Sequence, residues 1–282
     1  MAVETYRDND ILICVLDRPE RGNNLDAGVQ AALLRAWRTA ERDPAITAIV
    51  TRSSGKHFSV GAGADHLEEW AGLSLETIFA EHFSGKQGLE EDELPKPDEL
   101  DLLGFNRWAL SVRRIAKPMV AQISGAAAGG GLCLALLHHF RVGDMSARFA
   151  AAFGRLGLGP ELGLLHTLPE RIGIGAALEL QLSGRIVRAE ESLALGLLDR
   201  LVKEDGLDAA TLEYARALAA SPMATRHLLR ARAALQADAF ERALEREWAD
   251  QKTLWGAADF QEGVVSLLEK RVPEFRSDAS TL

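Results

Sequence analysis

Cysteine is nearly absent from this chain of 282 residues, which contains only Cys14 and Cys133. The two do not form a CxxC pair, so neither a disulfide framework nor a cysteine-based zinc site has support, and we predict no metal site. Blocks of consecutive Lys and Arg residues are also missing, and the net charge is -9. Because nucleic-acid binding needs clustered positive charge, these features predict that nucleic acid is not a partner.

Membrane segments are the next absence. The first ten residues lack the basic and apolar regions of a signal peptide. The longest apolar run, 126–137, is rich in glycine and too short to span a bilayer. We therefore expect no membrane association and a cytoplasmic location, in a reducing compartment. What the chain does contain is 47% hydrophobic residues, which suffices for one large domain or one domain with an appendage.

Apolar periodicity alternates between strand and helix along most of the chain. Short apolar runs predict strands at 11–16, 45–52 and 118–123. Helical spacing predicts helices at 25–42, with Asp26 as the cap, and at 66–71, 105–115, 129–138, 207–218 and 231–254. Strands that alternate with helices, followed by a helical tail, predict an α/β core at 1–202 and a C-terminal α-helical subdomain at 203–282.

The segment 72–104 has a different composition. It is acidic, and its stretch 85–99 contains Pro95, Pro97 and two glycines, at 85 and 88. Such a composition is typical of a mobile loop rather than of packed structure. We therefore expect an acidic loop insertion here, either a solvated surface loop or a lid.

Three consecutive glycines, 129–131, stand between a predicted strand and a predicted helix. Glycine lets backbone N–H groups approach a ligand closely, and the start of a helix adds partial positive charge. Together these features can stabilise a carbonyl oxygen as it becomes an enolate. A dinucleotide site has weak support, because His66 stands where the third glycine of a GxGxxG motif would be, and no GxxxxGK[ST] motif occurs.

Four segments carry a family resemblance: 58–65, 117–131, 183–202 and 262–275. In their order and spacing they resemble the crotonase (enoyl-CoA hydratase/isomerase) superfamily over nearly the whole chain, apart from the acidic insertion. The resemblance implies a crotonase-like spiral of ββα units with a C-terminal α-helical trimerisation subdomain. It also implies an acyl-CoA thioester as the substrate, no cofactor beyond the CoA of that substrate, and a homotrimer or a dimer of trimers.

In that family two backbone N–H groups hold the thioester carbonyl oxygen. The resemblance assigns one of them to Gly130. Segment 58–65 is two residues longer than the family's FSAGAD pattern. The second N–H group therefore belongs to Ala64, or to Ala62 if the extra residues fall later in the segment.

The two acids that the family's hydratases use are missing. Their positions hold Cys133 and Phe153, and hydration needs one group to activate water and another to deliver the proton. Glu161 instead matches an acidic position of dienoyl-CoA isomerases and of the ring-opening epoxide/oxepin isomerase of phenylacetate breakdown, which carry Asp there. Because an isomerase needs one base, the resemblance implies that Glu161 is the catalytic base of an enoyl-CoA isomerase.

Other readings of the same positions stay open. In dehalogenase-like crotonases the acid at the Glu161 position attacks the substrate carbon and a histidine activates water, and His82 falls near that histidine. A hydrolase or dehalogenase, an enoyl-CoA hydratase and a non-catalytic acyl-CoA-binding homologue are therefore the alternatives. The candidate substrate-binding residues are Ala62, His66, His82, Cys133 and Phe153. Two tryptophans in the C-terminal helix, Trp248 and Trp255, are expected to make core or trimer contacts.

Overall fold

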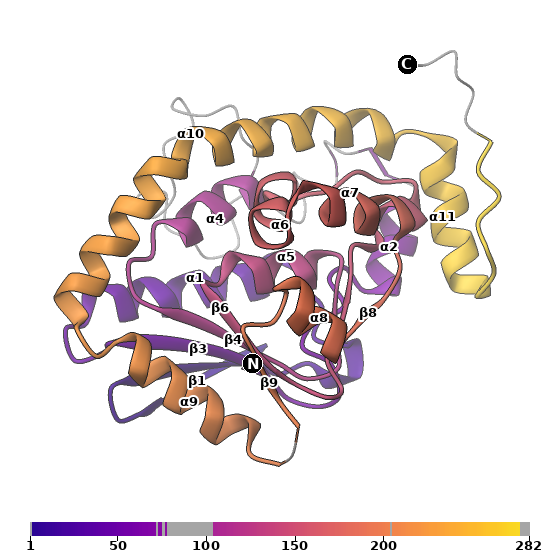
Figure 1. The fold of residues 1–282 in the computed structure, drawn as a ribbon. Helices are drawn as coiled ribbons and strands as arrows, with labels where there is room; N and C mark the ends of the chain where they lie inside the picture. The colour runs from indigo at the N-terminus through magenta and orange to yellow at the C-terminus, as the bar shows by residue number, and fades with distance from the viewer. Residues whose placement is uncertain (1, 72, 75–76, 78–103, 204, 277–282) are drawn as a thin grey trace.

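The structure is a computed structural model that describes residues 2–71, 73–74, 77, 104–203 and 205–276 (Figure 1). The predicted acidic insertion at 72–104 falls almost entirely outside the described residues, and so does His82. The described residues form two β-sheets surrounded by helices. None of the described helices is long and apolar enough to cross a membrane.

The larger sheet has six strands in the order β1-β2-β3-β4-β6-β9. Their bounds are β1 Val3–Asp8, β2 Ile11–Leu16, β3 Ala48–Ser53, β4 Met119–Ile123, β6 Phe140–Asp144 and β9 Arg200–Val202. β1 and β2 pair antiparallel, and all the other neighbours pair parallel. A parallel sheet is covered on both faces, which explains why β2 is a continuous apolar run rather than an alternating one and why all five residues of β4 are buried.

The smaller sheet has the order β5-β7-β8. Its strands are β5 Ala126–Ala128, β7 Arg148–Ala150 and β8 Val187–Arg188. The chain alternates between the two sheets, because β5 directly follows β4 and β7 directly follows β6. Ser59, which follows β3, adds a further parallel bridge to Ala127. β4 and β6 are therefore each followed by one strand of the smaller sheet before the next helix.

Helices surround the two sheets and form the C-terminal part of the chain (Figure 1). The α-helices are α1 Ala27–Arg42, α2 Ala64–Trp70, α4 Gly104–Arg113, α5 Gly130–Leu137, α6 Leu164–Ile172, α7 Ile174–Ser183, α8 Ala189–Leu195, α9 Leu207–Leu218, α10 Pro222–Trp255 and α11 Ala258–Glu269. Short 3₁₀ helices are η1 Pro19–Arg21 and η4 Ala152–Leu156. Helix α10 arches over α4 and α6, and α11 packs beside α2 (Figure 1).

Two apolar layers hold the larger sheet between helices. On one face, Ile13, Val50 and Val120 pack against α9 through Ala215. The opposite face belongs to a larger cluster that takes in α1, α4, α5, α6 and the C-terminal helices. The elements that build the site described below belong to this second layer.

The predicted α/β core with C-terminal helices is confirmed. β2 and α9 have the predicted bounds, and Asp26 caps α1 by accepting the N–H of Val29 at 2.8 Å. Helix α10 begins at Pro222 rather than at residue 231. Its first turns are mostly exposed and therefore lack apolar periodicity, but proline is well suited to the first position of a helix. The strands of the smaller sheet, two or three residues long, are too short to leave a pattern.

Candidate active site

Two backbone segments meet where α5 begins. The Ser59 N–H donates to the carbonyl of Ala126, and the Ser59 carbonyl accepts from the N–H of Ala128, both at 3.0 Å. The next turn brings Gly61, at φ +76°, against Gly130. A Cβ at Gly61 would lie 2.6 Å from the Gly130 nitrogen. Only glycine permits this approach, so the residue type fixes how the two segments lie together.

Two residues at this meeting point, Ala62 and Gly130, line one pocket. Gly130 is the first residue of α5, where N–H groups have no acceptor within the helix and carry partial positive charge. Among the described residues, no acceptor receives the N–H of Gly130 or of Ala62, and both residues line the pocket. Ala64 is the first residue of α2, after Gly63. Donors of this kind can stabilise a developing oxyanion.

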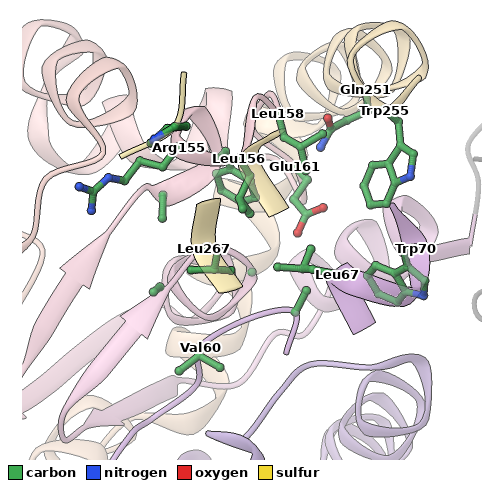
Figure 2. A pocket seen from close by; sticks show the side chains of 18 of the residues that line it. Val60, Leu67, Trp70, Arg155, Leu156, Leu158, Glu161, Gln251, Trp255 and Leu267 are labelled. Carbon is green, nitrogen blue, oxygen red and sulfur yellow. The ribbon is translucent and has the colours of Figure 1, made fainter. Parts of the chain in front are cut away.

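The pocket has a volume of about 560 Å³, and its walls come from elements that are far apart in the sequence. Leu67 and Trp70 come from α2, Phe153 from η4, Trp255 from α10 and Leu267 from α11. Figure 2 shows several of these side chains around the central space. A largely apolar cavity with few polar groups is typical of a small-molecule site.

Glu161 supplies a carboxylate to this apolar space. It lies in the loop between η4 and α6, and its side chain points into the pocket near Leu67 and Leu158 (Figure 2). A Cβ added at Gly130 would lie 3.3 Å from the Oε1 atom of Glu161. The carboxyl group is therefore beside the helix start that carries the free N–H. Burial raises the pKa of Glu161 from 4.5 to about 7.

The two positions that hold acids in the family's hydratases carry no acid here. Phe153 contributes an apolar wall to the pocket. Cys133 is buried, and its thiol donates to the backbone carbonyl of Glu161 at 3.3 Å. Burial raises the pKa of the Cys133 thiol well above its usual value. Among the described residues that line the pocket, Glu161 is the only carboxylate.

The predicted histidines and tryptophans lie at different distances from the pocket. The His66 ring stacks on Trp70, with ring centroids 5.4 Å apart, and its Nδ1 lies 3.2 Å from the Asn24 side-chain nitrogen. His66 therefore supports a pocket wall. Trp248 belongs to the apolar core and Trp255 packs against it, as predicted, and both also line the pocket together with Gln251 of the same helix. His82 lies outside the described residues.

Comparison with known proteins places the chain in a family. The enoyl-CoA hydratase/isomerase family model matches residues 74–278. A Mycobacterium bovis protein named "Probable enoyl-CoA hydratase" is 32% identical over 273 residues, which cover 95% of this chain and 90% of that protein. The 1,2-epoxyphenylacetyl-CoA isomerase of Escherichia coli is 28% identical over 272 residues, covering 96% and 97%.

Solved structures agree with this assignment. The crystal structure of an enoyl-CoA hydratase/isomerase from Pseudoalteromonas atlantica matches with a TM-score of 0.81 at 26% identity, over 98% of this chain and 100% of that one. The chain belongs to the enoyl-CoA hydratase/isomerase family, and the predicted crotonase-like fold is confirmed.

Proposed function

We propose that the protein is an enoyl-CoA isomerase that uses Glu161 as its single base and the N–H groups of Ala62 and Gly130 as an oxyanion hole. The observation that carries this proposal is the lone carboxylate among the described lining residues, next to Gly130. Ala62 is preferred to Ala64 because Ala62 lines the pocket and follows Gly61, which contacts Gly130.

In the proposed reaction the thioester oxygen accepts hydrogen bonds from the N–H groups of Ala62 and Gly130. The Glu161 carboxylate removes a proton from the α or γ carbon, and the electron pair of that C–H bond forms an enolate whose charge rests on the thioester oxygen. The Glu161 carboxylic acid then returns the proton to the carbon at the other end of the conjugated system. The double bond forms at its new position, and Glu161 is a carboxylate again.

The electrostatics of the pocket support this role. A base that must also act as an acid works best when its pKa is near the working pH. Burial raises the pKa of Glu161 to about 7, which satisfies both half-reactions. The same apolar surroundings strengthen the interaction between the enolate oxygen and the two N–H donors.

Hydration is the second candidate, because the Mycobacterium bovis relative is named a hydratase. A hydratase needs water in the pocket and a second group to deliver or remove a proton. Cys133 and Phe153, at the two positions in question, do not supply one. A double-bond shift therefore requires less of this pocket than hydration does.

Replacement of Glu161 by Gln tests the proposal. We expect kcat for the conversion between 2-enoyl-CoA and 3-enoyl-CoA thioesters to fall by about 10³-fold. Affinity for an unreactive acyl-CoA, measured by calorimetry, should be retained because the neutral amide has nearly the same shape. Retained turnover in the variant would exclude Glu161 as the base.

Analysis of the products and of the protein after turnover distinguishes the isomerase from the alternative functions. A product that has gained water indicates a hydratase. Solvent ¹⁸O incorporated into Glu161 during one turnover indicates the nucleophilic route of a hydrolase or dehalogenase. A parent protein that binds thioesters and converts none of a panel indicates a non-catalytic acyl-CoA-binding homologue.

We also propose that the protein assembles as a homotrimer or a dimer of trimers and acts in the cytoplasm. In support of assembly, Ile174, Leu178 and Leu182 of α7 are large apolar residues that remain exposed. An exposed apolar surface of this kind is typical of a protein–protein contact. Light scattering coupled to gel filtration would give the mass of the assembly.

A further inference from the structure

Helix α10 makes hydrogen bonds to the Glu161 loop on both sides of Glu161. Two residues before Glu161, the N–H of Gly159 donates to Gln251 Oε1 at 3.3 Å, and Gln251 Nε2 donates to the carbonyl of Gly159 at 3.1 Å. Two residues after it, the N–H of Gly163 donates to Glu247 Oε2 at 2.7 Å. The other oxygen of Glu247 accepts the N–H of Leu165, also at 2.7 Å.

Glu247 is an unusual residue for its position. It is 2% exposed and lies on the face of α10 that also buries Phe240, Leu244 and Trp248. Among the described residues no Lys or Arg forms an ion pair with it, so its partners are the two loop N–H groups. Burial raises the pKa of Glu247 to about 8, and the nearby Glu161 adds to this, while the two N–H donors oppose it. A buried carboxyl group without a cation is costly, so its bonds to the loop are its evident role.

The loop has a backbone that needs external support. Leu162, the residue directly after Glu161, is not a glycine but has φ +56°. Gly163 follows at φ +81°, and a Cβ there would lie 2.0 Å from Cε2 of Phe240 on α10. Such conformations persist where the surroundings fix them. Here the surroundings are the side chains of α10.

We infer that Glu247 and Gln251 are positioning residues that hold the Glu161 loop in place, so that the Glu161 carboxylate stays beside Gly130. This inference rests on the proposed role of Glu161 as the base. Glu247 is not a catalytic residue, because both of its oxygens bind backbone N–H groups of the loop. Gln251 lines the pocket, but its amide is also engaged with the loop backbone.

The variants that test the inference are Glu247→Ala, Glu247→Gln and Gln251→Ala, with Glu245→Gln as the control. Glu245 is an exposed carboxylate on the same helix, so this control removes a negative charge without touching the loop. Glu247→Ala should lower kcat by about 10²-fold with a much smaller change in KM, because a displaced base affects the chemical step more than binding. Glu247→Gln should be partly active, since its remaining oxygen still accepts one N–H group. Gln251→Ala should fall between Glu247→Gln and the control.

A crystal structure of Glu247→Gln, with that of the parent, provides a readout that does not depend on turnover. We expect the 159–165 loop to shift and the Glu161 carboxylate to move away from Gly130. The inference would be overturned if Glu161 kept its position in Glu247→Gln, or if the kcat of Glu247→Ala equalled that of Glu245→Gln. If instead Glu161→Gln retains activity, the proposed function fails, and the structures still show whether α10 holds the loop.

Discussion

The proposed oxyanion side of the site, Gly61, Ala62 and Gly130, is made of main chain, whereas the proposed base side depends on one side chain carried by the 159–165 loop. The N–H groups of the oxyanion side are fixed by strand pairing at Ser59 and by the start of α5. The loop that carries the carboxyl group of the base side is hydrogen-bonded to Glu247 and Gln251, which lie 82 to 92 residues after the loop residues that they contact. One pocket therefore combines a rigid backbone site with a loop whose position depends on a distant helix.

The difference predicts how each side responds to change. The oxyanion side has no titratable group among its three residues, so it is sensitive to shape and insensitive to pH. The base side contains two carboxyl groups, the half-buried Glu161 and the buried Glu247, whose pKa values desolvation raises to about 7 and about 8. It should therefore respond to pH and to the loss of hydrogen bonds.

Gly61→Ala should have the largest effect on the oxyanion side. The added Cβ would lie 2.6 Å from the Gly130 nitrogen, so the two N–H donors must separate. We expect kcat to fall by about 10²–10³-fold, as when one oxyanion donor is lost. Gly175→Ala in α7 is the matched control, because nothing lies within 4 Å of its added Cβ. Equal activity of the two variants would show that the approach of Gly61 to Gly130 is not needed.

The base side should show its character in the pH dependence of stability. The pKa of Glu161 rises from 4.5 to about 7 on folding. A carboxyl group with a raised folded-state pKa stabilises the fold while it is protonated, and this contribution is lost as the pH rises through the folded-state value. Glu161→Gln should therefore match the parent at about pH 4 and exceed its free energy of unfolding by about 2 kcal/mol at about pH 8.

Urea unfolding at these two pH values measures the effect, with Gly61→Ala as the comparison. The loss of stability in Gly61→Ala is steric, so its size should be the same at both pH values. If Glu161→Gln gained no stability at the higher pH, the Glu161 carboxylate would be solvated rather than buried, and the contrast between the two sides would fail.

The sequence allows Gly130 and Glu161 themselves to be predicted better than the distant residues that contact the Glu161 loop. Asp26, Gly130 and Glu161 belong to local patterns or family motifs, and each can be recognised within a few neighbouring residues. Glu247 and Gln251 could not be assigned to the loop, because hydrogen bonds across more than 80 residues leave no local pattern. A weaker signal does exist: a Glu and a Gln one turn apart lie on the same helical face as Phe240, Leu244 and Trp255.

The fold shows the same division. Long apolar runs predicted β2 and β4, and helical spacing predicted α9, because these patterns reflect burial on one face of a regular element. The two tryptophans of α10 had the spacing of a packing face, and that spacing could not show that the face lines a pocket. Which surface a helix covers is decided by tertiary packing.

Cys133 should give the smallest effect, although it connects the two sides. It lies in α5, the helix that Gly130 begins, and its thiol donates to the backbone carbonyl of Glu161. Cys133→Ala removes this one hydrogen bond and should reduce the free energy of unfolding by about 1–2 kcal/mol, with kcat little changed because α10 still contacts the loop.

Burial raises the pKa of both thiols, to about 12 for Cys14. Alkylating reagents should therefore leave the native protein active and react with both cysteines only after unfolding. Rapid alkylation of the native protein with loss of turnover would contradict this, and would show that the Cys133 thiol is accessible and that turnover depends on it.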